Sequence, residues 1–396
     1  MSKIKEIIAR EINDSIGRPT VEVELEASNG SFIASCPSGE STGKNEAVAL
    51  PAKKAVENVN NIIAPKLKGK DLDSQKELDE LMNRLDGTQN KSNLGANAIL
   101  PISIAICKTG AALQKLSLYD YISKISGNNN KIPLGSFNFL EGGAHAVNKN
   151  TLDLQEFMVV LQKKHFSENM MVANQVFSNL KSLVEKNYGA AVMGDEGGFA
   201  PKISRAEQAL FLLKSAIGNL EAKIAIDAAA SQFYKDGKYI LEGKEFSRQE
   251  LIDFYKDLVL RFPIISIEDA FSEEDWEGFK ELTRELSKTI IIGDDLTTTN
   301  IKRIREAQSK KACNGVIIKV NQIGTVTEAI EATNLAKSYG WKVMVSHRAG
   351  ETMETFIADF AVGIGADFIK SGSPSQPERM VKYNRLLEIE QELNKK

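Results

Sequence analysis

Six short apolar runs in the second half of the chain decide the fold. They read Lys223-Ile-Ala-Ile-Asp227, Ile264-Ile-Ser-Ile-Glu268, Thr289-Ile-Ile-Ile-Gly-Asp294, Gly315-Val-Ile-Ile-Lys319, Lys342-Val-Met-Val-Ser-His347 and Ala366-Asp-Phe-Ile-Lys370. The intervals between their last residues are 41, 26, 25, 28 and 23 residues, and a segment with helical spacing follows each run. This regular alternation predicts the α/β class and a (β/α)8-type barrel of parallel strands.

The last residues of these runs are all ionisable: Asp227, Glu268, Asp294, Lys319, His347 and Lys370. Each alone could be a solvated turn residue or a helix cap. The carboxyl ends of barrel strands meet at one mouth, however, where barrel enzymes have their active sites. We therefore expect three acids and three bases to converge there. Carboxylates without a cysteine ligand favour a hard cation such as Mg²⁺ over Zn²⁺.

The basic residues of this set, together with Arg348, favour a small anionic substrate. A guanidinium group binds a carboxylate or a phosphate through two parallel hydrogen bonds. A lysine beside other cations in a pocket has its charged form disfavoured, so it can act as a base near neutral pH. The acidic metal ligands, the anion-binding residues and the lysine base together predict proton abstraction next to a metal-bound carboxylate.

The first part of the chain has a different pattern. Residues 3–36 show alternating strand patterns around the turn signal Asn29-Gly30, and residues 46–59, 72–85 and 96–116 have the spacing or composition of helices. The polar stretch 127–131 is the best boundary. We expect an N-terminal α+β capping domain with a mobile lid loop at 1–127 and a C-terminal barrel domain at 128–396.

The composition excludes several classes of protein. Fifty Lys and Arg balance 53 Asp and Glu among 396 residues, which argues against a nucleic-acid coat or a polybasic membrane binder. Cys36, Cys107 and Cys313 are far apart and form no CxxC pair, which suits a reducing, cytoplasmic location. No apolar stretch approaches the ~18 residues of a membrane span, so none is predicted.

Ten ordered motifs identify a family. They are Asp14-Ser-Ile-Gly-Arg-Pro-Thr-Val-Glu22, Pro37-Ser-Gly-Glu-Ser-Thr-Gly43, Asn90-Lys-Ser-Asn-Leu-Gly-Ala-Asn-Ala-Ile-Leu100, Gly142-Gly-Ala-His-Ala146, Leu154-Gln-Glu-Phe-Met158, Gly194-Asp-Glu-Gly-Gly-Phe-Ala-Pro201, Ser266-Ile-Glu-Asp269, Gly293-Asp-Asp-Leu296, Ile318-Lys-Val-Asn-Gln-Ile-Gly-Thr325 and Val345-Ser-His-Arg348. On these motifs the chain resembles the enolase family over nearly its whole length, as a divergent and shortened member.

The resemblance implies a lyase that dehydrates 2-phosphoglycerate to phosphoenolpyruvate, a step of glycolysis and gluconeogenesis. Lys319 would remove the proton at C2, since a lysine base with Mg²⁺ is an established pattern of the enolase superfamily. Glu196 would protonate the departing 3-hydroxyl, with Glu156 and Gln155 beside it. His347 would line the site.

The same resemblance implies the metal and substrate contacts. Asp227, Glu268 and Asp294 would hold the first of two Mg²⁺ ions, and Ser41, in a closing loop, would bind the second. His145 would come from another mobile loop. Arg348 would hold the phosphate and Lys370 the carboxylate of the substrate.

Several residues depart from the family pattern. Ala349 stands where the family has a serine that helps bind phosphate, Glu40 where it has a small residue, Glu141 where it has an asparagine, and Gln376 where it has an arginine. Ala349, which lacks a hydroxyl donor, together with Glu40 and Gln376 leaves open a paralogue acting on a related phosphorylated or phosphonate acid. A non-catalytic binding protein on the same fold also stays open, since the tail Asn394-Lys-Lys396 could bind a partner.

The residues of the family's dimer interface are also mixed. Arg10 and Glu378, which pair there, are both present. The arginine that would pair with Glu22 is replaced by Glu388. Two facing acids repel each other, so we expect a homodimer or higher homo-oligomer with an altered interface.

Overall fold

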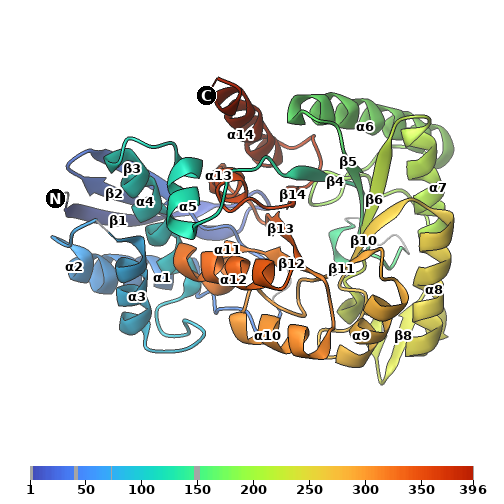
Figure 1. Ribbon diagram of the computed structural model, residues 1–396, viewed down its shortest axis with the longest axis horizontal. Coiled ribbons are helices and arrows are strands. Elements are labelled where there is room, and N and C mark those ends of the chain that lie inside the picture. The colour runs from blue at the N-terminus through green and yellow to red at the C-terminus, as the bar shows by residue number, and fades with distance from the viewer. Residues whose placement is uncertain (1–2, 40–42, 73, 147–151, 396) are drawn as a thin grey trace.

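The computed structural model describes residues 3–39, 43–72, 74–146 and 152–395. Figure 1 shows two parts side by side: the blue and teal elements of the first third of the chain on the left, and the barrel with its helices on the right. The second part carries the six predicted runs. The expected fold class, a barrel with an N-terminal α+β unit, is confirmed.

The N-terminal part begins with an antiparallel sheet of three strands in the order β1-β2-β3. Val21, Val23 and Leu25 are fully buried, whereas the glutamates between them face outward, as period-two alternation predicts. The strands and the helices that follow are β1 Ile4–Asn13, β2 Pro19–Ala27, β3 Gly30–Ser35, α1 Ala52–Asn58, a π-helical turn Val59–Ile63, α2 Ala64–Leu67, α3 Gln75–Asp86, α4 Ala96–Leu113 and α5 Leu118–Ser126.

The helix expected at 46–59 starts later than its spacing indicates. Its first residue is Ala52, because Pro51 fits the position before a helix and disfavours helical backbone in the residue that precedes it. The backbone N–H groups of Ala47 and Val48 bond elsewhere, to Gln322 O at 2.8 Å and Asn90 O at 2.7 Å. Segment 43–50 is thereby tied both to the barrel, through Gln322, and to the N-terminal part, through Asn90, rather than to its own helix.

The barrel closes with eight strands in the order β10-β11-β12-β13-β14-β4-β5-β6. The six predicted runs are six of these, and β4 and β5, which the pattern did not reveal, complete it. The expectation of parallel strands throughout is wrong for β5, which is antiparallel to both neighbours. The bounds are β4 Leu134–Glu141, β5 Glu156–Leu161, β6 Ala222–Asp227, β10 Ile264–Glu268, β11 Ile290–Gly293, β12 Gly315–Ile318, β13 Lys342–Ser346 and β14 Phe368–Lys370.

Helices cover the outside of the barrel, as Figure 1 shows for α6, α7 and α8. A separate cluster of buried apolar side chains from barrel strands, including Met158, Ile317 and Met344, fills the interior. The remaining elements are α6 Phe166–Tyr188, α7 Ala206–Ile217, a small sheet of β7 Tyr234–Lys235, β8 Lys238–Leu241 and β9 Lys244–Phe246, α8 Arg248–Arg261, α9 Trp276–Glu285, α10 Ile301–Lys310, α11 Val320–Ile323, α12 Val326–Ser338, α13 Phe356–Gly363 and α14 Pro377–Leu393.

Helix α4 is the one described helix that is long and apolar enough to cross a membrane. In this structure it packs against β2 and β3. Within its 18-residue window, 83% of the residues are buried inside the protein. That burial is what a core helix of a folded domain requires.

A buried carboxylate joins the two parts. Asp79 of α3 is fully buried and accepts hydrogen bonds from the Thr327 N–H at 3.0 Å and the Thr327 hydroxyl at 2.6 Å. Thr327 lies in the first turn of α12, whose N–H groups have no partner within the helix. Gln75 also donates to Asp79 at 3.1 Å. The acid of one part therefore caps a helix of the other.

We propose that the chain divides into residues 1–127 and 128–396. Helix α5 ends at Gly127, which has the left-handed backbone typical of helix ends, with φ of 72°. The first barrel strand, β4, begins at Leu134. The intervening polar segment supports a boundary there.

Replacing Asp79 by alanine should destabilise the protein by about 1–3 kcal/mol, because the amide of Gln75 and the N–H of Thr327 lose a buried acceptor. The measurement is chemical denaturation followed by circular dichroism. Glu80→Ala on the same helix is the matched control, since Glu80 is exposed and forms a surface ion pair with Arg84 at 3.6 Å. Equal stability of the two variants would contradict the capping role of Asp79.

Candidate active site

The ends of the barrel strands bring the predicted residues to one mouth. Glu268 of β10 and Asp227 of β6 are in register, and the reversed β5 starts with Glu156 opposite Asp227. One cavity of about 50 Å³ lies there. Its lining includes the predicted residues His145, Gln155, Glu156, Glu196, Asp227, Asp294, Lys319, His347, Arg348 and Lys370. Ser41 and Glu40 lie outside the described residues.

Lys370 is the centre of the acidic cluster. Its Nζ lies 2.9 Å from Asp227, 3.0 Å from Glu268 and 3.1 Å from Glu156, and all four side chains are buried. Burial alone would lower the pKa of Lys370, but Asp227, Glu156 and Glu268 outweigh it and raise the pKa well above the ordinary value. Lys370 therefore neutralises the acids through which a divalent cation would bind.

Lys319 makes the second such pair, with Asp294. Its pKa was expected to be lowered by neighbouring cations. Burial, Arg348 and Lys370 do act in that direction, but the Asp294 carboxylate outweighs them, so the pKa of Lys319 is raised in this structure. The expectation of a lowered pKa was wrong for Lys319 in this structure, because the sequence pattern did not reveal how close Asp294 lies to its amine. Gln322 donates to the other Asp294 oxygen at 3.0 Å.

Arg348 is held by a residue that the sequence did not single out. Its Nη1 lies 2.8 Å from Glu46 Oε2, and its Nη2 lies 3.3 Å from Glu46 Oε1. Asn321 accepts from Nη1 at 3.1 Å. The sequence pattern predicts that Glu46 belongs to a helix. Its acidic side chain near the expected lid loop is the feature that could have indicated a role at the site. The Glu46 carboxylate therefore occupies the two guanidinium donors of Arg348 that would have to bind a phosphate group.

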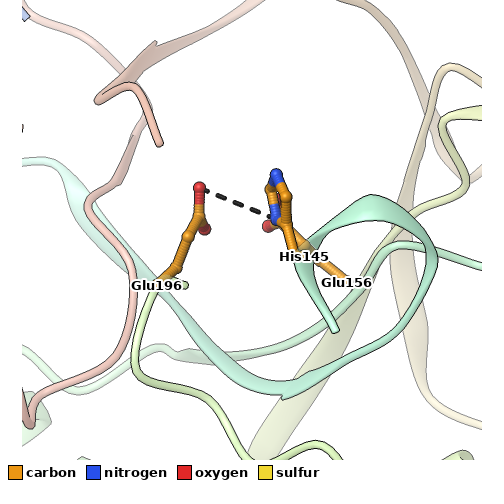
Figure 2. Close-up of side chains that lie close together, drawn as sticks. All are labelled: His145, Glu156 and Glu196. Carbon is orange, nitrogen blue, oxygen red and sulfur yellow. Dashed lines mark ion pairs between the residues drawn. The ribbon is translucent and has the colours of Figure 1, made fainter. Parts of the chain in front are cut away.

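His145, Glu156 and Glu196 form a third group at the mouth. Figure 2 shows the three side chains pointing toward one another, and His145 Nδ1 lies 3.5 Å from Glu156 and 3.8 Å from Glu196. Burial raises the pKa of Glu156, and the charge of Glu196 adds to that effect. Burial also opposes ionisation of Glu196, but His347, His145 and Arg379 outweigh it and lower its pKa. The pKa values of these two neighbouring acids are therefore shifted in opposite directions.

Glu141, one of the departures from the family pattern, positions the segment that carries Glu196. It ends β4 and is fully buried. Its carboxylate accepts hydrogen bonds from the Gly198 N–H at 2.5 Å and the Glu196 N–H at 3.3 Å. A side chain at Gly194 would collide with this carboxylate, which explains the glycine there. Burial raises the pKa of Glu141, and Glu196 adds to the effect.

Two other departures also lie at the site. Ala349 lines the cavity and is buried. Gln376 lies at the start of α14, where its amide nitrogen donates to Asp195 O at 3.2 Å, beside Glu196. The missing serine hydroxyl therefore changes the lining of the cavity, and the missing arginine changes the contacts of the segment next to Glu196.

The carboxylates at the mouth suit a divalent cation. Within the described part of the chain, Asp269, Asp294 and Asp295 bring carboxylate oxygens within 4.8 Å of one another, and His145, Glu156 and Glu196 form another such group. The first contains only oxygen donors, as Mg²⁺ or Ca²⁺ prefers, and shares Asp294 with the predicted triad. The other two members of the triad, Asp227 and Glu268, meet at Lys370 instead.

Two family models match the chain: "Enolase, N-terminal domain" over residues 4–122 and "Enolase, C-terminal TIM barrel domain" over residues 129–396. The chain belongs to the enolase family. The enolases of Methanocaldococcus jannaschii and Solanum lycopersicum are each 47% identical to it, over 409 and 428 residues, and each alignment covers 99% of this chain and 96% of the relative. The resemblance seen in the ten motifs is thereby confirmed.

Asp269 is a residue of this enolase-family site to which sequence reasoning gave no role. Its carboxylate accepts hydrogen bonds from the backbone N–H groups of Asp294 at 2.9 Å and Asp295 at 2.7 Å. It follows Glu268 with a left-handed backbone, φ 41°, so the chain turns sharply to present it. This contact fixes the segment that carries Asp294.

Replacing Asp269 by asparagine should weaken Mg²⁺ binding by about 10- to 100-fold, because an amide nitrogen would face a backbone N–H and Asp294 would lose its fixed position. Isothermal titration calorimetry measures the affinity. Asp253→Asn on the exposed face of α8 is the control. An unchanged Mg²⁺ affinity in the Asp269 variant would show that Asp294 does not depend on this contact.

Proposed function

We propose that this chain is a phosphopyruvate hydratase, which removes water from 2-phosphoglycerate to give phosphoenolpyruvate in glycolysis and gluconeogenesis. The observation that carries the proposal is the convergence of Glu156, Glu196, Lys319 and Lys370 on one cavity of an enolase-family barrel. A protein that only bound a partner would not require buried acids and lysines in mutual contact, since buried charges are costly.

We propose that Lys319 is the base. It follows β12 and lies among Asp294, Arg348 and Lys370. Asp294 is the main group that favours the protonated form and Glu268 adds to it, whereas burial and the two cations oppose it. Once Asp294 turns to another partner, the pKa of Lys319 falls, and its amine can take the proton from C2 of the substrate.

The metal assignment is also a proposal: two Mg²⁺ ions per site, with Asp227, Glu268 and Asp294 holding the first and Ser41 contributing to the second. The oxygen-only donor set supports a hard cation. Bound ions would stabilise the ene-diolate that forms when the C2 proton leaves. Lys370, now among the acids, would turn to the carboxylate of the substrate.

The hydroxyl that leaves C3 needs a proton on its oxygen, so that it departs as water. We assign the acid to Glu196, with Glu156 and Gln155 beside it and His145 facing both glutamates. Since His145 contacts both glutamates, and the pKa of Glu156 is raised while that of Glu196 is lowered, we propose that the pair acts together in delivering the proton. Arg348 would exchange Glu46 for the substrate phosphate, and His347 lines the site.

We further propose a cytoplasmic location and a homodimer or higher homo-oligomer with an altered interface. All three cysteines are free and buried, which suits a reducing compartment. Arg10 pairs with Glu22 of its own chain at 2.6 Å, and Glu388 pairs with Arg385 at 3.0 Å. These internal pairs satisfy the residues that would otherwise repel across an interface.

The assay is direct: protein, Mg²⁺ and 2-phosphoglycerate should produce a rise in ultraviolet absorbance as phosphoenolpyruvate forms. Chelation of Mg²⁺ or the change Lys319→Ala should abolish the rise, because either the charge stabilisation or the base is lost. Lys302→Ala, at an exposed position on α10, should retain full activity. No turnover by the unmodified protein at high substrate concentration would rule the proposal out.

Ala349→Ser should tighten 2-phosphoglycerate binding. The added hydroxyl would lie in the cavity lining and could donate to the phosphate, a charge-assisted bond worth roughly 1.5–3 kcal/mol, or at least about tenfold in affinity. The measurement is KM together with a direct binding titration of the Lys319→Ala form. Unchanged affinity would mean that the protein already compensates for the lost serine.

A further inference from the structure

Arg379 is a fully buried arginine to which sequence analysis assigns no role. It lies in the first turn of α14. Its Nη1 contacts His347 Nδ1 at 2.7 Å and Arg348 O at 2.6 Å, and its Nη2 contacts Ala349 O at 2.6 Å and Asp195 O at 3.3 Å. A single guanidinium therefore joins the segment after β13 to the segment that carries Glu196.

The contact with His347 fixes the chemistry of its imidazole. Arginine has five donors and no acceptor, so the nitrogen 2.7 Å from it must accept. Nδ1 then carries no proton, and the neutral ring has its hydrogen on Nε2. That nitrogen lies 3.2 Å from Glu196 Oε2, and both side chains are buried.

We propose that Arg379 is a positioning residue that holds His347 as the neutral Nε2–H tautomer, aimed at Glu196. This deepens the proposed function and, for its catalytic consequence, rests on the assignment of Glu196 as the acid. The tautomer itself depends only on the arrangement of Arg379, His347 and Glu196.

The consequence concerns which oxygen of Glu196 can carry a proton. Oε2 accepts from Asn138 Nδ2 at 3.2 Å and also lies 3.2 Å from His347 Nε2, a close contact that is not a hydrogen bond in this structure. A proton on Oε2 would meet two donors, so the proton of the acid form belongs on Oε1. Oε1 is the oxygen that faces His145 at 3.8 Å. Arg379 thus directs the proton of the acid toward the side occupied by His145.

The charges around His347 agree with a neutral ring. The ionisable groups that act on it are Glu196, Arg379 and Glu351. Burial is the largest effect, and together with Arg379 it outweighs the two acids and lowers the pKa of His347 to about 4. Glu351 is itself paired with Lys382 at 2.7 Å. Removing the guanidinium therefore leaves two acids facing the ring and raises its pKa.

Nuclear magnetic resonance can read the tautomer directly, because the chain has only three histidines. The unmodified protein is labelled with ¹⁵N-histidine, without substrate, and His347→Gln assigns the signals. We expect His347 to give the pattern of neutral Nε2–H at pH 7 and down to about pH 5. An Nδ1–H tautomer or an imidazolium at pH 7 would overturn the proposal, and this outcome needs no arginine variant.

The variant Arg379→Met keeps an unbranched side chain of similar length but removes every donor. In it His347 should accept a proton at higher pH than in the unmodified protein, or populate Nδ1–H, and kcat should fall by about 10- to 100-fold with a smaller change in KM. Arg385→Met on the same helix is the control, since it breaks pairs with the buried Asp359 and the more exposed Glu388 and Glu392, none of which is among the groups that act on His347. It should leave the His347 signals unchanged.

The outcomes separate the two proposals. A correct tautomer with no turnover of 2-phosphoglycerate would reject the proposed function but not the role of Arg379 in holding His347. Turnover by the unmodified protein, with the His347 signals the same in Arg379→Met, would reject the role of Arg379 alone. If Arg379→Met does not fold, the spectrum of the unmodified protein still tests whether His347 is the neutral Nε2–H tautomer.

Discussion

The interaction on which the site depends is the contact of the Lys370 ammonium with Asp227, Glu268 and Glu156. These acids end or begin three different barrel strands, β6, β10 and β5, and all are buried. Three carboxylates cannot be buried together without cations, because the desolvation of each is costly. The lysine therefore makes the acidic half of the mouth stable. Any divalent cation that binds there must replace this lysine as the neutralising charge.

The basic half is held in place from outside the barrel. Arg348 is fixed by Glu46 from segment 43–50, and His347 by Arg379 from α14. Each cation at the mouth thus contacts an acid or a carbonyl oxygen of the protein. A bound substrate or metal would compete for these contacts. The site is a set of buried ion pairs, and under the proposed function an anionic substrate and a cationic metal would replace contacts that the protein makes within itself. Such an exchange suits a reaction in which charge develops on the substrate.

The strand-end pattern predicted the barrel and the residues that its strand ends bring to the mouth, because six runs with ionisable ends are a regular, local signal, whereas His145, Gln155, Glu156 and Glu196 came from the family motifs. The direction of β5 was not predictable, since an apolar run looks the same in either direction, yet it is what brings Glu156 opposite Asp227. Arg379 and Asp79 resemble ordinary helix-surface charges until tertiary packing buries them. The pKa of Lys319 was misjudged because it depends on one distance, to Asp294, that no spacing encodes.

The roles proposed for Lys319 and Glu196 are tested most directly by hydrogen exchange. The measurement is exchange of the C2 hydrogen of 2-phosphoglycerate with deuterated solvent, with Mg²⁺ present. If Lys319 is the base and Glu196 the acid, Glu196→Gln should still exchange this hydrogen while it fails to form phosphoenolpyruvate. Lys319→Ala should do neither, because no other group is assigned to the C2 proton. Exchange that persists in Lys319→Ala, or that disappears only in Glu196→Gln, would contradict the account.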